Sequence, residues 1–138
     1  MKTQTRLLLA VGLGAMLGSI ARSLVSVGLL HLFGPGFGWG TLVVNVAGSL
    51  LIGLYATLTE PDGRLFASPA RRQFVLSGFC GGFTTFSIFS LETLLLVERQ
   101  AFGLAAINVV GSTGLWLLAV WAGYRLGVRF NRLKGSIT

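Results

Sequence analysis

Four long apolar runs constrain the fold of this chain more than any other feature. They cover about residues 7–33, 40–59, 69–97 and 102–127, and each approaches or exceeds the ~20 residues that a helix needs to cross a bilayer. Only 11% of the 138 residues are charged, whereas a soluble domain carries roughly a quarter. We therefore predict an all-α membrane protein, with four transmembrane helices in a single transmembrane domain over residues 1–138.

The first run follows Lys2 and Arg6, an arrangement that also begins a secretory signal peptide. The run continues to Phe33, however, and carries no convincing cleavage site. We therefore expect it to remain as a helix. Before the third run, Ser68 followed by Pro69 is typical of a helix N-cap with proline at the first helical position.

Small residues predict where these helices approach one another. Gly14 and Gly18 in the first run, and Gly111 and Gly114 in the fourth, have spacings that allow close helix packing. Cys80 is the only cysteine, so it forms no intrachain disulfide, and we expect it to pack among apolar side chains.

The basic residues are distributed unequally between the two sides of the predicted bundle. Four helices place both termini on one side, and the positive-inside rule then assigns that side to the cytoplasm. The other side carries only Arg99. This topology explains the formal charge of +7, and no nucleic-acid-binding motif accompanies it. The nine basic residues on the side of the termini are Lys2, Arg6, Arg64, Arg71, Arg72, Arg125, Arg129, Arg132 and Lys134.

Polar residues inside the apolar runs are candidates for function, because the bilayer makes them costly. Arg22 near a helix centre would cost about 2.5–3.5 kcal/mol. It can either snorkel to an interface or line an aqueous vestibule that attracts anions. Asn45 is either a hydrogen-bonding link between helices or a donor to an anion. Glu92, Asn108 and Ser112 are weaker candidates.

The third run contains the most unusual segment, GGFTTFSIFS at residues 81–90. Its glycines leave helical geometry easily, and its threonines and serines can hydrogen-bond the freed backbone. We therefore predict a break in the third helix. Non-helical backbone at membrane depth is tolerated where it is buried in protein or lines a cavity, and its carbonyls are good ligands for a hard cation.

Aromatic and hydroxyl side chains alternate after this predicted break. Helical spacing brings Phe86 and Phe89 towards one face, and it places Thr85, Phe89 and Glu92 on a second stripe. Ring edges carry the positive part of the aromatic quadrupole, so the rings can line an anion path. Ordinary packing explains any two phenylalanines at this spacing, but it accounts poorly for the whole cluster. The candidate hydrogen-bond donors to an anion are Thr85, Ser87, Ser112 and Asn45.

Motifs in all four runs resemble those of the Fluc (CrcB) family of fluoride channels. They are GxxxR at residues 18–22, GTLxxNxxG at 40–48, GGFTTFSIFSLE at 81–92 and GS at 111–112. The combination of GTLxxN with TTFSxFS is highly specific. The resemblance implies a passive, fluoride-selective channel, and not an enzyme, that spans the bacterial inner membrane several times and exports toxic cytoplasmic fluoride.

The same resemblance implies an assembly and a set of sites. The assembly is a dual-topology antiparallel dimer in the lipid bilayer, with two fluoride pores and a central structural sodium ion. Backbone carbonyls of Gly81 and Thr84 would bind the sodium ion, and Arg22 would lie near the vestibule. The fluoride pathway would comprise Asn45, Thr85, Phe86, Ser87, Phe89, Glu92 and Ser112.

The partner subunit and two other functions remain open at this point. A subunit that inserts both ways should carry little charge bias, so a heterodimer with an oppositely oriented paralogue competes with a homodimer. The stretch between the phenylalanine motif and the GS of the fourth run is about one helical turn shorter than the family pattern, which affects the register of Asn108 and Ser112. A small multidrug transporter would need an acidic residue deep in the first run, which has none. A noncatalytic assembly subunit would explain the small residues but not TTFSIFS.

Overall fold

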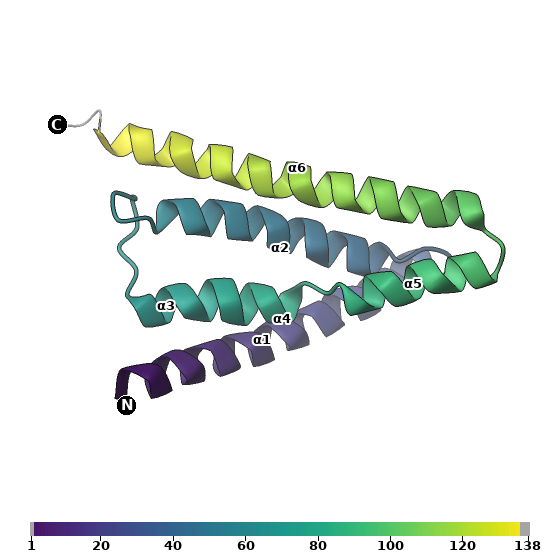
Figure 1. The fold of residues 1–138 in the computed structure, drawn as a ribbon, viewed down its shortest axis with the longest axis horizontal. Coiled ribbons are helices and arrows are strands. Elements are labelled where there is room, and N and C mark those ends of the chain that lie inside the picture. Colours follow the sequence, from purple (N-terminus) through teal and green to yellow (C-terminus); the bar gives the residue numbers. More distant parts are fainter. Residues whose placement is uncertain (1, 136–138) are drawn as a thin grey trace.

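The computed structural model is an all-helical bundle whose described residues are 2–135, with side chains described as far as Arg132 (Figure 1). Lys134, which belongs to the basic group on the side of the termini, therefore lies outside the described side chains. Four helices are long and apolar enough to cross a membrane, namely Lys2–Phe33, Trp39–Leu58, Pro69–Glu98 and Phe102–Arg132. The four predicted spans are confirmed.

Seven helical elements make up these four spans. In chain order they are α1 (Lys2–Phe33), α2 (Trp39–Leu58), α3 (Pro69–Gln73), η1 (Phe74–Cys80), α4 (Gly81–Phe83), α5 (Ser87–Glu98) and α6 (Phe102–Gly135). The N-terminal end of α1 and the C-terminal end of α6 lie at the same end of the bundle, together with the connection from α2 to α3 (Figure 1).

The helix ends follow local chemistry. Ser68 caps α3, because its side-chain oxygen accepts a hydrogen bond from the Arg71 N–H at 3.4 Å, and Pro69 is the first helical residue. This predicted N-cap is confirmed. Two helices are longer than their apolar runs, since α1 begins at Lys2 and α6 continues to Gly135. Lys, Arg and Gln are good helix formers, so both helices extend beyond their apolar parts.

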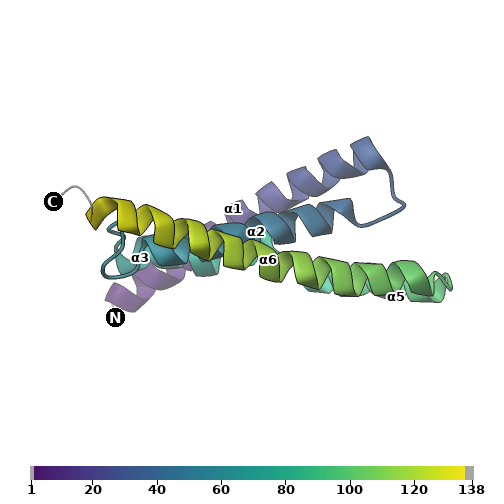
Figure 2. The ribbon, with the colours of Figure 1, turned by 90° about the horizontal axis from the view of Figure 1, so that it is seen from above.

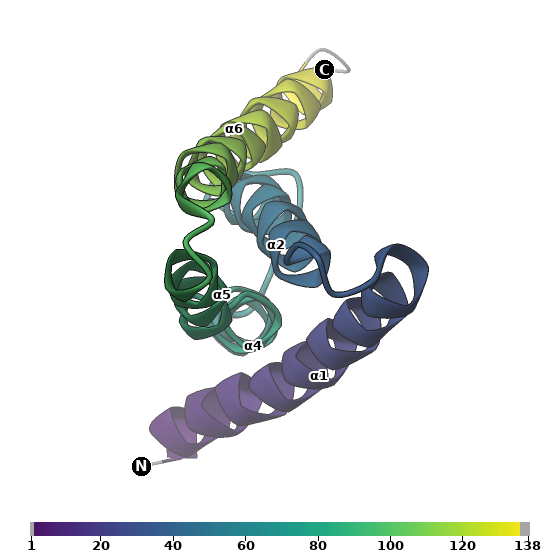
Figure 3. The ribbon, with the colours of Figure 1, turned by 90° about the vertical axis from the view of Figure 1, so that its right-hand side faces the viewer.

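Glycines allow α1 to lie directly against the third span. A Cβ atom at Gly18 would lie 2.1 Å from the Phe79 carbonyl oxygen, and one at Gly14 would lie 2.3 Å from the Phe74 carbonyl oxygen. Only glycine permits this approach, so the predicted packing role of both residues is confirmed. Viewed along the bundle, α1 passes below α4 and α5 (Figure 3).

A second close contact joins α2 to α6 along much of their length, as the view from above shows (Figure 2). Cβ atoms at Gly53 and Gly123 would each lie 2.2 Å from a backbone carbonyl oxygen of the opposite helix. The packing predicted for Gly111 and Gly114 does not occur within the described chain, where a Cβ at either position would meet nothing within 4 Å. These two glycines face away from the other helices of the subunit.

The buried core is small, as expected when the bilayer is the solvent for most of the surface. Val44 and Cys80 are the largest side chains that are completely buried, so the predicted packing of Cys80 is confirmed. Large apolar side chains such as Leu8, Leu24 and Val110 are 70–74% exposed. Such surfaces suit contact with lipid or with a second subunit.

Candidate functional site

A non-helical segment connects α4 to α5 in the middle of the third span. Thr84, Thr85 and Phe86 lie outside both helices, and the backbone of Thr84 is extended, with φ −83° and ψ 158°. Asn45 on α2 holds this segment. Its amide Nδ2 donates to the Thr85 carbonyl at 2.8 Å, and its Oδ1 accepts from the Thr85 N–H at 2.7 Å. We call these two hydrogen bonds the Asn45 clamp.

The Asn45 clamp changes the partners of the preceding helical turn. In a continuous helix the Thr85 N–H would bond the Gly81 carbonyl, but here it bonds Asn45 instead. The Thr84 N–H and hydroxyl both donate to the Cys80 carbonyl, each at 2.9 Å. The Gly81 carbonyl therefore lacks its usual helical donor, and the extended Thr84 turns its own carbonyl out of the helical direction.

Gly48 allows α2 to approach this segment. A Cβ atom at Gly48 would lie 2.3 Å from Cγ2 of Thr84. Gly48 follows Asn45 by three residues, so both lie on one face of α2. The glycine and the asparagine of the GTLxxNxxG motif thus act on the same three-residue segment.

The two phenylalanines of the third span have different surroundings. Their ring centroids are 5.6 Å apart, but Phe86 is 71% exposed and Phe89 only 6%. Phe89 packs in an edge-on contact against Trp116 of α6, with centroids 4.8 Å apart. Phe86 is thus the ring available at the surface of the subunit, and Phe89 links α5 to α6.

Hydroxyl groups surround the start of α5. The Thr85 and Ser87 hydroxyls are 3.3 Å apart, and the Thr85 oxygen also accepts from the Ile88 N–H at 3.3 Å. Ser90 donates to the Phe86 carbonyl at 2.9 Å. The predicted stripe of Thr85, Phe89 and Glu92 is interrupted, because α5 begins at Ser87 and Thr85 lies outside it.

A chain of polar side chains links α5 to α6. Ser112 donates to Oδ1 of Asn108 at 3.3 Å, and Nδ2 of Asn108 donates to the Thr93 hydroxyl at 2.9 Å. Thr93 in turn donates to the Phe89 carbonyl at 2.8 Å. Asn108 and Ser112 are each 3% exposed. The fourth span therefore places these two residues one helical turn apart in a buried network.

A cavity of about 450 Å³ lies between the second half of α1, the connection from α1 to α2, and α5. The polar residues in its wall are Arg22, Thr41, Thr85, Glu92, Arg99 and Asn108. Oε1 of Glu92 accepts a hydrogen bond from the Thr41 hydroxyl at 2.7 Å. Oε2 of Glu92 and Nε of Arg22 are buried atoms without a hydrogen-bond partner among the described residues. Two polar groups at the cavity are therefore available to a ligand or an ion.

The structure thus brings the predicted site residues into three groups, of which the third comprises Phe89, Asn108 and Ser112 between α5 and α6. Arg22, Thr85 and Glu92 line the cavity, whereas Asn45 holds the non-helical segment. Sequence reasoning missed three residues that contact these groups, namely Thr41, Thr93 and Trp116. A signal for Thr41 was present, because it precedes Asn45 by four residues and therefore shares its helical face.

Comparison with known protein families adds an independent finding. Residues 9–124 match the family described as "CrcB-like protein, Camphor Resistance (CrcB)". The chain belongs to the CrcB family. The family resemblance seen in the sequence motifs is therefore confirmed. Together with the four apolar helices, membership identifies this CrcB protein as a multi-pass membrane protein.

Similar proteins cover almost the whole chain. One, named "Fluoride-specific ion channel FluC 1", from Rhodopseudomonas palustris (strain BisB18), is 52% identical over 126 residues, which are 91% of this chain and 89% of the relative. Another, named "Fluoride-specific ion channel FluC", from Opitutus terrae, is 51% identical over 130 residues, which are 94% of this chain and 98% of the relative.

Proposed function

We propose that this CrcB family member is a subunit of a passive, fluoride-selective channel that exports fluoride from the cytoplasm, and that it has no enzymatic role. The observation that carries the proposal is the Asn45 clamp, which binds the backbone of Thr85 next to the extended Thr84. The clamp lies where an exposed ring and several hydroxyl groups meet. The names of the similar proteins support fluoride as the permeant ion.

The site contains groups that can replace the water around a small anion. Thr85 and Ser87 provide hydroxyl donors, and the exposed ring of Phe86 can present its positive edge. Asn45 keeps one amide hydrogen beyond the one it donates to Thr85. On the other side of the segment, Ser112 belongs to the buried network with Asn108. We assign these residues, with Phe89 and Glu92, to the fluoride pathway.

The cavity that Arg22 lines fits the role of an entrance. Arg22 and Arg99 outnumber Glu92 among the charged residues of its wall, and a net positive charge raises the local concentration of anions. The vestibule interpretation of Arg22 is favoured over snorkelling, because its Nε is buried at the cavity and not placed at the end of the helix.

A structural sodium ion fits the non-helical segment. Sodium is a hard cation that prefers oxygen ligands, like other hard cations. The Gly81 carbonyl has lost its helical donor, and the Thr84 carbonyl follows an extended backbone. A Cβ at Gly81 would meet nothing within 4 Å in the described chain, which leaves space for the same segment of a second subunit. Each subunit would then contribute two carbonyls to one ion.

The proposed assembly is an antiparallel dimer with two pores. Phe86 is 71% exposed in the single subunit, and Gly111 and Gly114 face open space; a second subunit would cover these positions. The second subunit is either an identical chain or an oppositely oriented paralogue. Crosslinking, combined with labelling of tagged termini from each side of the membrane, distinguishes these cases, since uniformly cytoplasmic termini exclude a self-paired antiparallel dimer.

Growth in fluoride tests the function in cells. In a bacterial strain without its own fluoride exporter, expression of the native chain should restore growth on fluoride medium. The variant Phe86→Ile should fail to restore growth while its dimer is retained. If the native chain is present in the membrane as a dimer and gives no resistance, the proposed homomeric channel is wrong.

A further inference from the structure

The last helix is longer than a membrane span requires. α6 contains 34 residues, and at 1.5 Å per residue it is about 51 Å long, whereas the hydrocarbon core is about 30 Å thick. If the core begins near Phe102, it ends roughly 20 residues later, close to Trp121. The following residues of α6 therefore lie among the lipid headgroups and beyond them.

One face of this extension packs on α2. A Cβ at Gly123 would lie 2.2 Å from the Leu50 carbonyl oxygen, and a Cβ at Gly127 would lie 2.7 Å from Cβ of Thr57. Nδ2 of Asn131 donates to the Thr57 carbonyl at 2.9 Å. These three α6 residues recur at intervals of four, so they define the inner face of the extension.

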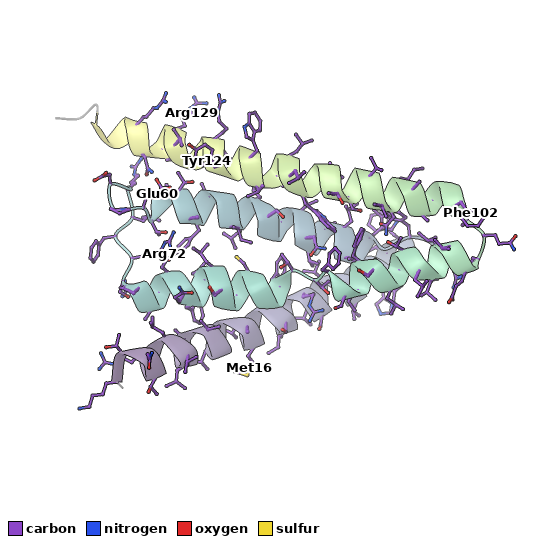
Figure 4. The ribbon with its side chains drawn as sticks, viewed as in Figure 1. Met16, Glu60, Arg72, Phe102, Tyr124 and Arg129 are labelled. Carbon is purple, nitrogen blue, oxygen red and sulfur yellow. The ribbon has the colours of Figure 1, made fainter. Side chains whose placement is uncertain are left out.

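The opposite face carries a row of arginines. Arg125, Arg129 and Arg132 follow one another at intervals of four and three residues, and at ~100° per residue their mean direction is roughly opposite to the inner face. All three are exposed, and Figure 4 shows Arg129 on the outer side of α6. None forms an ion pair with another described residue. We call these three residues the arginine stripe.

Aromatic residues mark the membrane end of the arginine stripe. Trp121 and Tyr124 are 56% and 50% exposed, and both residue types are enriched at membrane interfaces. The guanidinium of Arg125 lies over the Trp121 ring, 5.3 Å from its centroid, which is within cation–π distance. The helix length and the residue types thus place the interface at the same level of α6.

We propose that the arginine stripe binds the phosphate headgroups of anionic phospholipids in the leaflet on the side of the termini. A guanidinium presents paired N–H donors that match phosphate oxygens. None of the three forms an ion pair with a described carboxylate, although Arg132 lines a small pocket together with Glu60 and Asp62. The depth of Arg125 beside an interfacial tryptophan favours a lipid headgroup over phosphate in solution. This inference requires only a multi-pass membrane protein, so it stands independently of the proposed fluoride function.

Quenching of Trp121 by brominated lipids tests the proposal. The chain has three tryptophans, so the variant Trp39→Phe/Trp116→Phe leaves Trp121 as the only tryptophan, which is excited selectively over tyrosine. It is reconstituted in vesicles of fixed phosphatidylglycerol and phosphatidylcholine content, with bromine on one lipid or the other. Brominated phosphatidylglycerol should associate with the surface around Trp121 at least about fivefold more strongly than brominated phosphatidylcholine, since each arginine near an anionic surface contributes about 1 kcal/mol.

Charge variants identify the source of this preference. Replacing Arg125, Arg129 and Arg132 together by glutamine should bring the ratio of the association constants of phosphatidylglycerol and phosphatidylcholine close to one. The matched control Arg6→Gln removes charge at the same end of the bundle but on α1, and it should leave the ratio unchanged. Equal quenching by both lipids in the parent variant, or an unchanged ratio in the triple variant, overturns the proposal, as does loss of the preference on adding inorganic phosphate.

A second measurement avoids the tryptophan substitutions, in case they impair folding. The chain with all its tryptophans is purified with mixed lipids, and native mass spectrometry counts the phosphatidylglycerol molecules that it retains. The triple glutamine variant should retain fewer of them than the Arg6→Gln control. Equal retention contradicts binding by the arginine stripe.

Discussion

Replacing Asn45 by alanine removes both hydrogen bonds of the Asn45 clamp, and we expect this change to abolish most fluoride flux. The bonds measure 2.8 and 2.7 Å. Hydrogen bonds between membrane helices are worth about 0.6–1.7 kcal/mol each, so their combined loss weakens the clamped form by about 1–3 kcal/mol. This free-energy loss corresponds to a decrease of roughly 5- to 150-fold in the population of the clamped form relative to conformations without the Asn45 clamp.

The physical reason is that the Thr85 N–H must find another acceptor at membrane depth. The nearest alternative is the Gly81 carbonyl, its acceptor in a continuous helix. That rearrangement would remove both the extended conformation and the carbonyl proposed to bind sodium. Asn45→Asp keeps the acceptor for the Thr85 N–H but loses the donor to the Thr85 carbonyl, so we expect intermediate flux.

Asn131 provides a matched control. It also makes two hydrogen bonds to backbone groups, to the Arg64 N–H at 2.8 Å and to the Thr57 carbonyl at 2.9 Å, but at the other end of the bundle. Asn131→Ala should lower thermal stability and leave the fluoride efflux rate per dimer close to native. The reasoning is refuted if dimeric Asn45→Ala retains native flux, or if both variants lose flux equally.

Three further changes test other parts of the account. Phe86→Ile should reduce fluoride flux strongly while size-exclusion chromatography still shows a dimer; native flux would remove this ring from the pathway. Gly53→Ala places a Cβ 2.2 Å from a backbone carbonyl oxygen of α6 and should destabilise the fold by about 1–3 kcal/mol. The control Gly12→Ala, whose Cβ meets nothing within 4 Å, should leave stability unchanged. Equal melting temperatures of the two variants would contradict this packing. Thr41→Val removes the hydrogen bond to Glu92 and should slow efflux about tenfold, and Thr41→Ser should restore it; if serine does not, the bond is not the cause.

The four spans were predictable because bilayer thickness fixes the length of each apolar run. Local signals were equally informative, as Ser68 and Pro69 show at the start of α3. The end of α6 was not predictable in this way, because apolarity marks the part of a helix in lipid, and Gly135 lies well beyond it.

The contacts of the site required the three-dimensional arrangement. Polarity inside an apolar run identified Asn45, but its partner Thr85 lies 40 residues away in the chain. Glycine spacing predicted close packing at Gly18 correctly, whereas Gly111 has no neighbour within 4 Å in the described chain, so its packing stays a prediction for a second subunit. Spacing shows that a helix can be approached closely, and only the fold determines which helix approaches it.

The most direct test of the central claim is ion efflux from liposomes that contain the purified protein. Fluoride-loaded vesicles should release fluoride rapidly once a counter-ion pathway is provided, without any proton gradient, and chloride-loaded vesicles should release almost no chloride. Absence of fluoride efflux from a protein that is demonstrably dimeric, equal release of chloride, or a requirement for a proton gradient would contradict a passive fluoride-selective channel.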